Sequence, residues 1–322
     1  MKAAIRRKYG NPDVLTVENI TKPTPQEGEV LVKVHATTVS RTDCAILTGK
    51  PFIMQFFIGL GKPKVPTLGT DFAGVVEAVG SGVESLKVGG KVWGFGDEGI
   101  DSQAEYMCFP VKDAIGLMPE NISFEQAAAS LEGAHYAYNF MNKVDLKAGQ
   151  KILVNGATGA IGSAMLQFLK AQGLYVTAVC NTKNIPLIQS LGADKIYDYL
   201  QEDFTKDTEK YDCIFDAVGK STFGKCKSLL KKKGTYISSE LGPKAQNPFL
   251  AMITPFFGGK KVLFPLPSNV RSSMEFIKNL IEKDQFRPVI DQTLPLEKIA
   301  EAYRYVLTGE KTGNVVIRMV DF

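Results

Sequence analysis

The chain has 322 residues, of which 44% are hydrophobic and 22% charged, with a formal net charge of +4. This ordinary composition excludes a chain that is disordered throughout, and the length predicts two domains. It contains no long run of like charge and no apolar stretch near the roughly 18 residues of a membrane span. We therefore expect no nucleic-acid partner and no integral membrane association.

The first residues, MKAAIRRKYG, lack the apolar core of a signal peptide. The five cysteines form no C-x-x-C pair, which favours free thiols in a reducing compartment. Only two histidines, His35 and His135, are present, so a zinc site built from several His and Cys ligands is hard to assemble. These features predict a cytoplasmic protein.

The first third of the chain reads as β-structure. Residues 30–35 alternate with the period of two that is typical of a strand, and 75–79 and 91–93 are further short strands. Glycine-rich turns separate them. Short strands with frequent turns predict a barrel-like or sandwich unit.

From about residue 124 strands alternate with helices. Residues 151–154 are expected to form a strand that is buried on both faces, because the run Ile152-Leu153-Val154 is apolar without alternation. Further strands are expected at 174–179, 213–215, 234–237 and 261–264, and helices at 161–169 and 185–191. This order predicts an α/β fold with a doubly wound parallel sheet.

The hydrophobic pattern changes again in the last part of the sequence. Residues 296–306 have the spacing of an amphipathic helix that ends at Gly309, and 314–317 form a last apolar strand. We expect this strand to return to the first domain and to close its sheet.

The strongest local signal is Asn155-Gly156-Ala157-Thr158-Gly159-Ala160-Ile161-Gly162, which follows a buried strand and opens a helix. It is a G-x-G-x-x-G fingerprint with Ala157 at the first glycine position. Small residues let the backbone approach a pyrophosphate, and the helix N-terminus offers unpaired N–H groups and a positive dipole end. We predict that residues 157–162 bind a dinucleotide, the alternative being a plain glycine-rich turn.

The end of the next strand bears on which dinucleotide binds. NAD enzymes usually place an Asp or Glu there, for the ribose hydroxyls. This chain has Asn181, Thr182 and Lys183, which offer hydrogen bonds and a cation that suit a 2′-phosphate. We favour NADP(H) over NAD(H); the alternative for Lys183 is a solvent-facing residue at a helix start.

Short-chain dehydrogenases also combine a glycine-rich turn with a Rossmann sheet. They place the turn at the N-terminus and use a Tyr-x-x-x-Lys pair. Here the turn lies in the middle of the chain, and no tyrosine is followed four residues later by lysine. We reject that class.

Segments spread over nearly the whole chain carry one further pattern: 32–36, 40–43, 69–76, 89–94, 157–162, 191–194, 215–219 and 311–316. In this order they resemble the medium-chain dehydrogenase/reductase superfamily. The resemblance implies a GroES-like, β-rich catalytic domain built from 1–123 and 287–322. It implies a Rossmann dinucleotide-binding domain over 124–286.

Departures from that superfamily's pattern concern zinc. Zinc-dependent members carry cysteine where this chain has Ser40, and Gly-His-Glu where it has Gly69-Thr70-Asp71. The four-cysteine loop of their structural zinc has no counterpart between Trp93 and Tyr106. Glu132 lies near the third ligand position, but one carboxylate does not hold zinc. The resemblance is to the zinc-free branch, similar to quinone oxidoreductases and enone reductases, with no metal expected.

Without a Lewis acid, the acceptor has to be activated by conjugation, as in a small hydrophobic quinone or an α,β-unsaturated carbonyl. Ser40 and Thr70, which replace the ligands, are expected to face the cleft and are candidate donors to the developing oxyanion. Tyr136 is a candidate proton donor, with packing as the alternative. Asp43 is expected to fix local backbone instead of transferring protons.

Other cofactor contacts are implied by resemblance and by position at strand ends: Tyr199, Val218, Gly219, Ser238, Ser239 and Asn314. Relatives imply a homodimer. The apolar segments 52–58 and 248–257 suit a substrate cavity, a dimer contact or a peripheral membrane patch. Two other functions stay open: an NADP-dependent alcohol or ketone dehydrogenase, and a non-catalytic NADPH-binding module.

Overall fold

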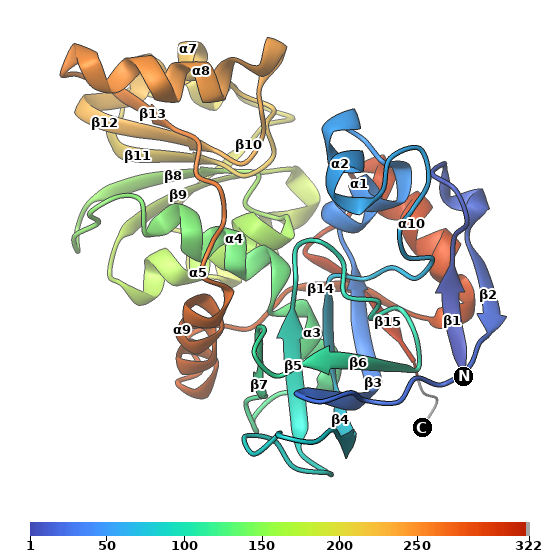
Figure 1. The fold of residues 1–322 in the computed structure, drawn as a ribbon. Helices are drawn as coiled ribbons and strands as arrows, with labels where there is room; N and C mark the ends of the chain where they lie inside the picture. The colour runs from blue at the N-terminus through green and yellow to red at the C-terminus, as the bar shows by residue number, and fades with distance from the viewer. Residues whose placement is uncertain (320–322) are drawn as a thin grey trace. The chain divides into compact units, whose positions relative to one another are not determined.

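The computed structural model describes residues 1–319, and the chain divides into two compact units, each with a sheet of its own (Figure 1). Unit 1 holds Met1–Glu132, Val270–Glu282 and the chain from Arg287 onward. Unit 2 holds Gly133–Asn269 and Lys283–Phe286. The α/β class with a separate β-rich domain, expected from the sequence, is confirmed.

Unit 1 is built on a mainly antiparallel seven-stranded sheet in the order β14-β15-β3-β4-β5-β7, with β6 pairing β3. Its strands are β3 (Glu29–Val39), β4 (Asp71–Val79), β5 (Lys91–Phe95), β6 (Tyr106–Pro110), β7 (Ile115–Leu117), β14 (Ile290–Pro295) and β15 (Asn314–Arg318). A separate pair joins β1 (Lys2–Ile5) to β2 (Thr16–Asn19). The alternation predicted for 30–35 reflects the fully buried Val30, Val32 and Val34.

The chain end returns to the first sheet, as predicted. Strand β15 pairs antiparallel with β3, with Val315 opposite Val39, although the two are far apart in sequence. Helix α10 (Ile299–Thr308) packs into the same core through the buried Tyr303. The Tyr303 hydroxyl donates to Gln103 Oε1 at 2.9 Å, so its polar tip is satisfied.

The other helices of unit 1 are α1 (Arg41–Thr48), α2 (Gln55–Ile58), α3 (Phe124–Ala129) and α9 (Val270–Glu282). Arg271 and Lys278 of α9 donate to backbone carbonyls of Asp113 and Leu117, at 2.8 and 3.1 Å. This contact places 270–282 with unit 1, whereas the resemblance placed them in the Rossmann domain. The expected domain boundaries stay predictions.

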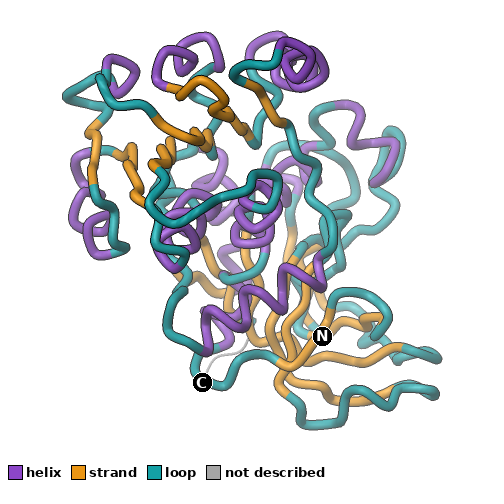
Figure 2. The backbone as a smooth tube through the Cα atoms, turned by 90° about the vertical axis from the view of Figure 1, so that its left-hand side faces the viewer, coloured by secondary structure: helices purple, strands orange, loops and turns teal. Residues whose placement is uncertain are grey.

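Unit 2 carries a six-stranded, wholly parallel sheet in the order β10-β9-β8-β11-β12-β13. Its strands are β8 (Lys151–Asn155), β9 (Tyr175–Cys180), β10 (Lys195–Asp198), β11 (Tyr211–Asp216), β12 (Leu230–Ser238) and β13 (Lys261–Leu263). Its helices are α4 (Glu132–Met141), whose first residue belongs to unit 1, α5 (Ala160–Ala171), α6 (Ile185–Ser190), α7 (Phe223–Cys226) and α8 (Gln246–Ile253). Helices lie on both faces of this sheet (Figures 1 and 2), which explains the continuous apolar run of β8.

The strand order of unit 2 reverses between β8 and β11, whose carboxyl ends face the same edge. Ligands of open parallel sheets bind at such a reversal, outside the carboxyl ends of the strands. The fold therefore points to the turns after β8 and β11 as the candidate binding edge. Among the described residues, no helix combines the length and the apolar character needed to cross a bilayer.

Candidate functional site

The glycine-rich turn lies between the end of β8 and the start of α5. Gly159 is the N-cap of this 12-residue helix and makes no side-chain cap hydrogen bond. The N–H groups of Ala160, Ile161 and Gly162 in the first turn have no acceptor inside the helix. They and the positive end of the helix dipole are thus available to an anion such as a pyrophosphate.

Two glycines bring the backbone of this turn close to its neighbours. A Cβ on Gly162 would lie 2.1 Å from the carbonyl oxygen of Gly156, and one on Gly156 would lie 2.8 Å from Val218 Cβ. Gly156 also has a φ of +79°, which favours glycine. The turn therefore depends on its glycines, and the structure places Val218 beside it as part of the same site.

The remaining members of the motif have unequal roles. Ala157 is fully buried, and its N–H donates to the Val179 carbonyl at 3.1 Å, so it joins the turn to β9. Thr158 is half-exposed and its hydroxyl is open to a ligand. A dinucleotide would thus be held from Thr158 to Gly162, with Ala157 supporting the turn.

Asp216, the last residue of β11, organises the neighbouring turn, and the sequence argument assigned it no role. Its buried carboxylate accepts from the Asn155 side chain and the Gly219 N–H, both at 3.0 Å, and from the Tyr236 hydroxyl at 2.8 Å. The carboxylate thereby fixes the Val218–Gly219 turn against the end of β8. Its position in a strand-end Asp-Ala-Val-Gly segment was the available signal.

The residues after β9 are arranged around Asp198. The Thr182 hydroxyl donates to Asp198 Oδ2 at 2.5 Å, and the Leu200 N–H donates to Oδ1 at 3.0 Å. Asp198 is buried, and both of its carboxylate oxygens accept hydrogen bonds from within the fold. Asn181 accepts from the Asn184 side chain at 2.7 Å, and Lys183 is exposed. Among residues 1–319, Lys183 makes no ion pair, so its ammonium is available to an anion.

A cavity of about 660 Å³ lies beside this edge of unit 2. Tyr199, which is 54% exposed, and Ser221 line it together with three cations, Lys206, Lys220 and Lys225. The carboxylates of Glu202 and Asp203 also line it. Tyr199 is thereby placed at a hollow with a net positive lining.

The other predicted cofactor contacts differ in availability. Ser238 is buried and accepts from the Glu240 N–H at 3.2 Å, whereas the buried Ser239 hydroxyl has no hydrogen-bond partner among the described residues. Asn314 belongs to unit 1, where its side chain donates to the Val289 carbonyl at 3.0 Å. Ser239 is thus the stronger candidate, and the roles of all three stay predictions.

Tyr136 lies on α4 in unit 2. Its ring meets the rings of His135 and Phe140 edge to face, with centroids 5.8 and 6.1 Å apart. Burial lowers the pKa of His135 to about 4, so this histidine is neutral at physiological pH. The geometry accounts for packing by Tyr136, and its role as a proton donor stays a prediction.

In unit 1, Ser40 and Thr70 converge on Asp43. Ser40 is the N-cap of α1: its hydroxyl accepts from the Asp43 N–H at 3.0 Å, and its own N–H donates to Asp43 Oδ2 at 2.8 Å. The buried Thr70 hydroxyl donates to the same oxygen at 3.4 Å. The expected backbone role of Asp43 is confirmed. The Thr70 hydroxyl donates to Asp43, whereas the Ser40 hydroxyl only accepts from it and keeps its own proton available as a donor.

The same region does not fit a zinc ion. Burial, together with the nearby Asp71 and Glu132, raises the pKa of Asp43 well above its usual range, and burial raises that of Asp71 to about 7. Burial likewise raises the pKa of the Cys44 thiol, which therefore stays protonated. Within the described residues, no three His, Cys, Asp or Glu side chains are grouped as metal ligands.

A second polar group of unit 1 was missed by the sequence argument. The Thr42 hydroxyl donates to Glu132 Oε1 at 2.5 Å, across 90 residues of chain. Lys311 lies nearby: burial lowers the pKa of its ammonium, and the charge of Glu132 offsets part of that shift. All three side chains are half-buried. Thr42 and Glu132 form a hydrogen-bonded pair that can hold and move a proton. The Lys311 ammonium donates to the Gly313 carbonyl and adds positive charge near this pair.

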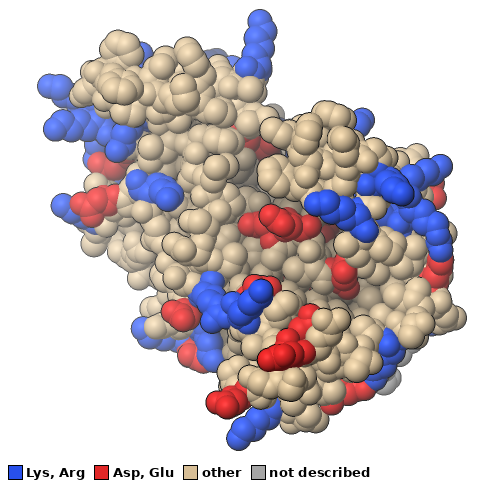
Figure 3. Space-filling model, viewed as in Figure 1, with Lys and Arg blue, Asp and Glu red and all other residues tan. Residues whose placement is uncertain are grey.

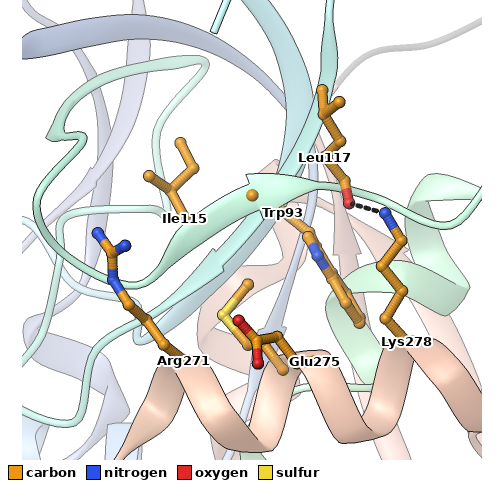
Figure 4. Close-up of a pocket in the computed structure, with 8 residues that line it drawn as sticks. Trp93, Ile115, Leu117, Arg271, Glu275 and Lys278 are labelled. Atoms are coloured by element: carbon orange, nitrogen blue, oxygen red, sulfur yellow. Dashed lines mark hydrogen bonds between the residues drawn. The ribbon is translucent and has the colours of Figure 1, made fainter. Parts of the chain in front are cut away.

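A smaller cavity of about 220 Å³ lies in unit 1 between α9 and strands β5 and β7 (Figure 4). Trp93, Leu117, Arg271, Glu275 and Lys278 line it. Figure 4 shows the Lys278 ammonium bonded to the Leu117 carbonyl, so this cation serves the packing of α9. This cavity is lined by none of the predicted site residues.

Comparisons with known families match parts of both units, and the second match runs from unit 2 into unit 1. Residues 26–129 match the family described as "Alcohol dehydrogenase GroES-like domain", and 191–317 match the family described as "Zinc-binding dehydrogenase". The second description names a metal for which Ser40 and Thr70 provide no ligands.

Relatives along the whole chain are reductases by name. The chain is 32% identical to the 2-methylene-furan-3-one reductase of Solanum lycopersicum, over 99% of this chain and 79% of the relative. It is 32% identical to the chloroplastic NADPH-dependent alkenal/one oxidoreductase of Arabidopsis thaliana, over 98% and 79%. Its fold matches the quinone oxidoreductase of Coxiella burnetii with a TM-score of 0.88, 25% identity and 99% coverage of both chains.

Replacing Gly162 by alanine should disrupt the turn, because the new Cβ would lie 2.1 Å from the Gly156 carbonyl. We expect Gly162→Ala to weaken dinucleotide binding at least about tenfold and to cost roughly 1–3 kcal/mol of unfolding free energy. Titration calorimetry with NADPH and thermal unfolding measure the two effects.

Gly224→Ala is the matched control, because the nearest atom to its Cβ is Thr222 Oγ1 at 3.8 Å. This variant should bind NADPH like the unmodified chain. Unchanged binding by Gly162→Ala would show that the close approach is not needed.

Proposed function

This chain belongs to the medium-chain dehydrogenase/reductase superfamily, and we propose that it is a zinc-independent reductase that uses NADPH to reduce a quinone or an α,β-unsaturated carbonyl. The proposal rests on the residue types that this chain has at the positions where zinc-dependent members carry their metal ligands. Ser40 and Thr70 stand there, and both hydroxyls bond to Asp43. An acceptor that conjugation already activates needs hydrogen-bond donors and no Lewis acid.

A nicotinamide cofactor suits the edge of unit 2, where it would supply the hydride. Thr158 and the first turn of α5 would hold the pyrophosphate, and Val218 and Gly219 would border it. Lys183, with Asn181 and Thr182, would bind the 2′-phosphate of NADP(H). The exposed ammonium of Lys183 and the commitment of Asp198 to Thr182 and Leu200 support this choice over NAD(H).

We assign delivery of the proton to Thr42 and Glu132. In the structure the Thr42 hydroxyl donates to Glu132, so its proton is held away from a substrate. Protonation of Glu132 would reverse this hydrogen bond and free the Thr42 proton for the oxygen that gains charge. Lys311 would then stabilise the carboxylate left on Glu132. Ser40 and Thr70 are proposed to shape the site through Asp43.

The homodimer and the cytoplasmic location expected from the sequence stay proposals. Two organelles are alternatives to the cytoplasm. The Arabidopsis relative is named chloroplastic, and a human relative, NAD(P)H oxidoreductase RTN4IP1, is named mitochondrial. Light scattering of the purified chain measures its mass directly.

A substrate panel tests the proposed reaction. With NADPH, we expect turnover of enones and quinones, no measurable turnover of simple ketones, and no loss of rate after treatment with a strong chelator. A chelator-sensitive rate on simple ketones would point to the alcohol or ketone dehydrogenase. Tight NADPH binding without turnover of any acceptor would point to the binding module.

Lys183→Glu tests the choice of cofactor. The new carboxylate would repel a 2′-phosphate, so the ratio of kcat/KM with NADPH to that with NADH should fall on the order of tenfold or more. Lys143→Glu, the same charge change at another exposed residue, is the control and should leave the ratio unchanged. An unaltered ratio in Lys183→Glu contradicts the phosphate assignment.

Thr42→Val and Glu132→Gln test the proton path. We expect Thr42→Val to lower kcat on the order of 100-fold. Glu132→Gln should also lower kcat, because the amide cannot pass a proton to Thr42. Thr48→Val is the matched control: it lies on the same helix and bonds only to backbone carbonyls, those of Cys44 and Ala45. An unchanged kcat in Glu132→Gln would reject the role of Glu132.

A further inference from the structure

An apolar surface segment of unit 1 follows helix α1. Residues 52–60 comprise the 3₁₀ helix Phe52–Met54, helix α2 and the two residues after it. Five large apolar side chains of this segment are between 59% and 64% exposed: Phe52, Ile53, Phe56, Phe57 and Leu60. We call the surface that they form the α2 face. A cluster of exposed apolar side chains on a folded unit indicates a surface that contacts something else.

The inner side of the segment explains why the α2 face is turned outward. Ile58 is buried in the core of unit 1, and Met54 packs against the same cluster. The Tyr9 hydroxyl donates to the Gly59 carbonyl at 2.5 Å. A Cβ on Gly59 would lie 2.2 Å from the Lys62 carbonyl oxygen, so the chain turns back tightly after α2. The segment is thus fixed to unit 1 through its inner side, and its outer side chains stay exposed.

Charge beside the α2 face has one sign. Residues 44–70 contain no acidic residue and three lysines, Lys50, Lys62 and Lys64. The Lys64 N–H donates to the Ile58 carbonyl at 2.9 Å and its ammonium to the Phe57 carbonyl at 2.8 Å, which places this cation at the end of α2. All three lysines are exposed, and within residues 1–319 none of them forms an ion pair.

Neighbouring carboxylates do little to offset these lysines. Asp43 and Asp71, the nearest acidic residues in sequence, are buried, and burial raises the pKa of both carboxyl groups. Asp13, four residues after Tyr9, pairs with Arg304 at 2.6 Å. Figure 3 shows the surface over α2, which is labelled in Figure 1, as tan with Lys and Arg side chains at its right-hand side. The net field at the border of the α2 face is therefore positive.

We propose that the α2 face docks the protein on an anionic phospholipid surface, with the apolar side chains entering the interface and the lysines meeting the headgroup phosphates. Exposed aromatic and aliphatic side chains with a basic border have the composition of an interfacial, non-spanning contact. A symmetric contact between two copies of this face is disfavoured, because it would bring the lysines of both copies together. The proposal does not rest on the proposed reaction, and its experiment needs neither cofactor nor acceptor.

Vesicle sedimentation of the full chain tests the docking. We expect binding to vesicles of phosphatidylcholine with phosphatidylglycerol, and binding on the order of tenfold weaker to phosphatidylcholine alone. Raising NaCl from about 50 mM to about 500 mM should reduce the bound fraction, since salt screens the lysines. Phe52→Ser with Phe56→Ser should lower the partition coefficient about tenfold or more.

Val88→Ser with Leu117→Ser is the matched control, because these side chains of unit 1 are 63% and 52% exposed and lie outside the α2 face. This variant should bind vesicles like the unmodified chain. Thermal unfolding should be alike for both double variants, since all four side chains are exposed.

The lysines have a test of their own. Lys50→Gln with Lys62→Gln should weaken binding to the anionic vesicles and leave binding to neutral ones unaltered. Lys87→Gln with Lys112→Gln makes the same charge change at exposed residues elsewhere in unit 1 and should leave binding to both kinds of vesicle unaltered.

Three results would overturn the proposal. The first is equal vesicle binding by the Phe52/Phe56 variant and the unmodified chain, and the second is an equal loss of binding in the Val88/Leu117 variant. The third is an unmodified chain that does not bind anionic vesicles. In that case, a lower solution mass of the Phe52/Phe56 variant would make the α2 face an interface between copies of the chain, and a raised KM for an apolar enone would assign it to substrate binding.

Discussion

The close approach of the first turn of α5 to the end of β8 is the constraint on which the candidate site depends. At Gly162 the helix backbone comes so near the Gly156 carbonyl that no side chain fits between them. The approach lets the amides of the helix start lie at the reversal point of the sheet, where a phosphate can reach them. It also sets the position of Val218, which fills the space over Gly156.

Around this turn, buried carboxylates serve as local anchors. Asp216 collects the Asn155 amide, the Gly219 N–H and the Tyr236 hydroxyl, and so holds two neighbouring strand ends in register. Asp198, the last residue of β10, acts similarly by accepting from Thr182 and Leu200. In both cases the carboxylate is committed to hydrogen bonds within the fold.

Unit 1 also uses a buried carboxylate to fix local structure. The Asp43 carboxylate accepts from the Ser40 N–H and the Thr70 hydroxyl, and the Asp43 N–H donates to the Ser40 hydroxyl. The side chains that replace zinc ligands therefore belong to a buried network. The polar group that stays half-exposed is Thr42 with Glu132 and Lys311. This arrangement separates residues that hold the site from residues that can move a proton.

The sequence by itself determined the class of fold, the dinucleotide turn and the absence of zinc ligands at positions 40 and 70, because each depends on local periodicity or on residue type at fixed spacing. The continuous apolar run of β8 and the glycines of the turn specify their own conformation within a few residues. The return of β15 to β3 was also predictable, from the order of segments. Only the tertiary structure joined Thr42 to Glu132, brought Asn155, Gly219 and Tyr236 to the Asp216 carboxylate and turned the phenylalanines of α8 and of residues 254–257 outward. Those relations link residues many positions apart, or depend on which side of a helix packs, and neither is encoded in a local pattern.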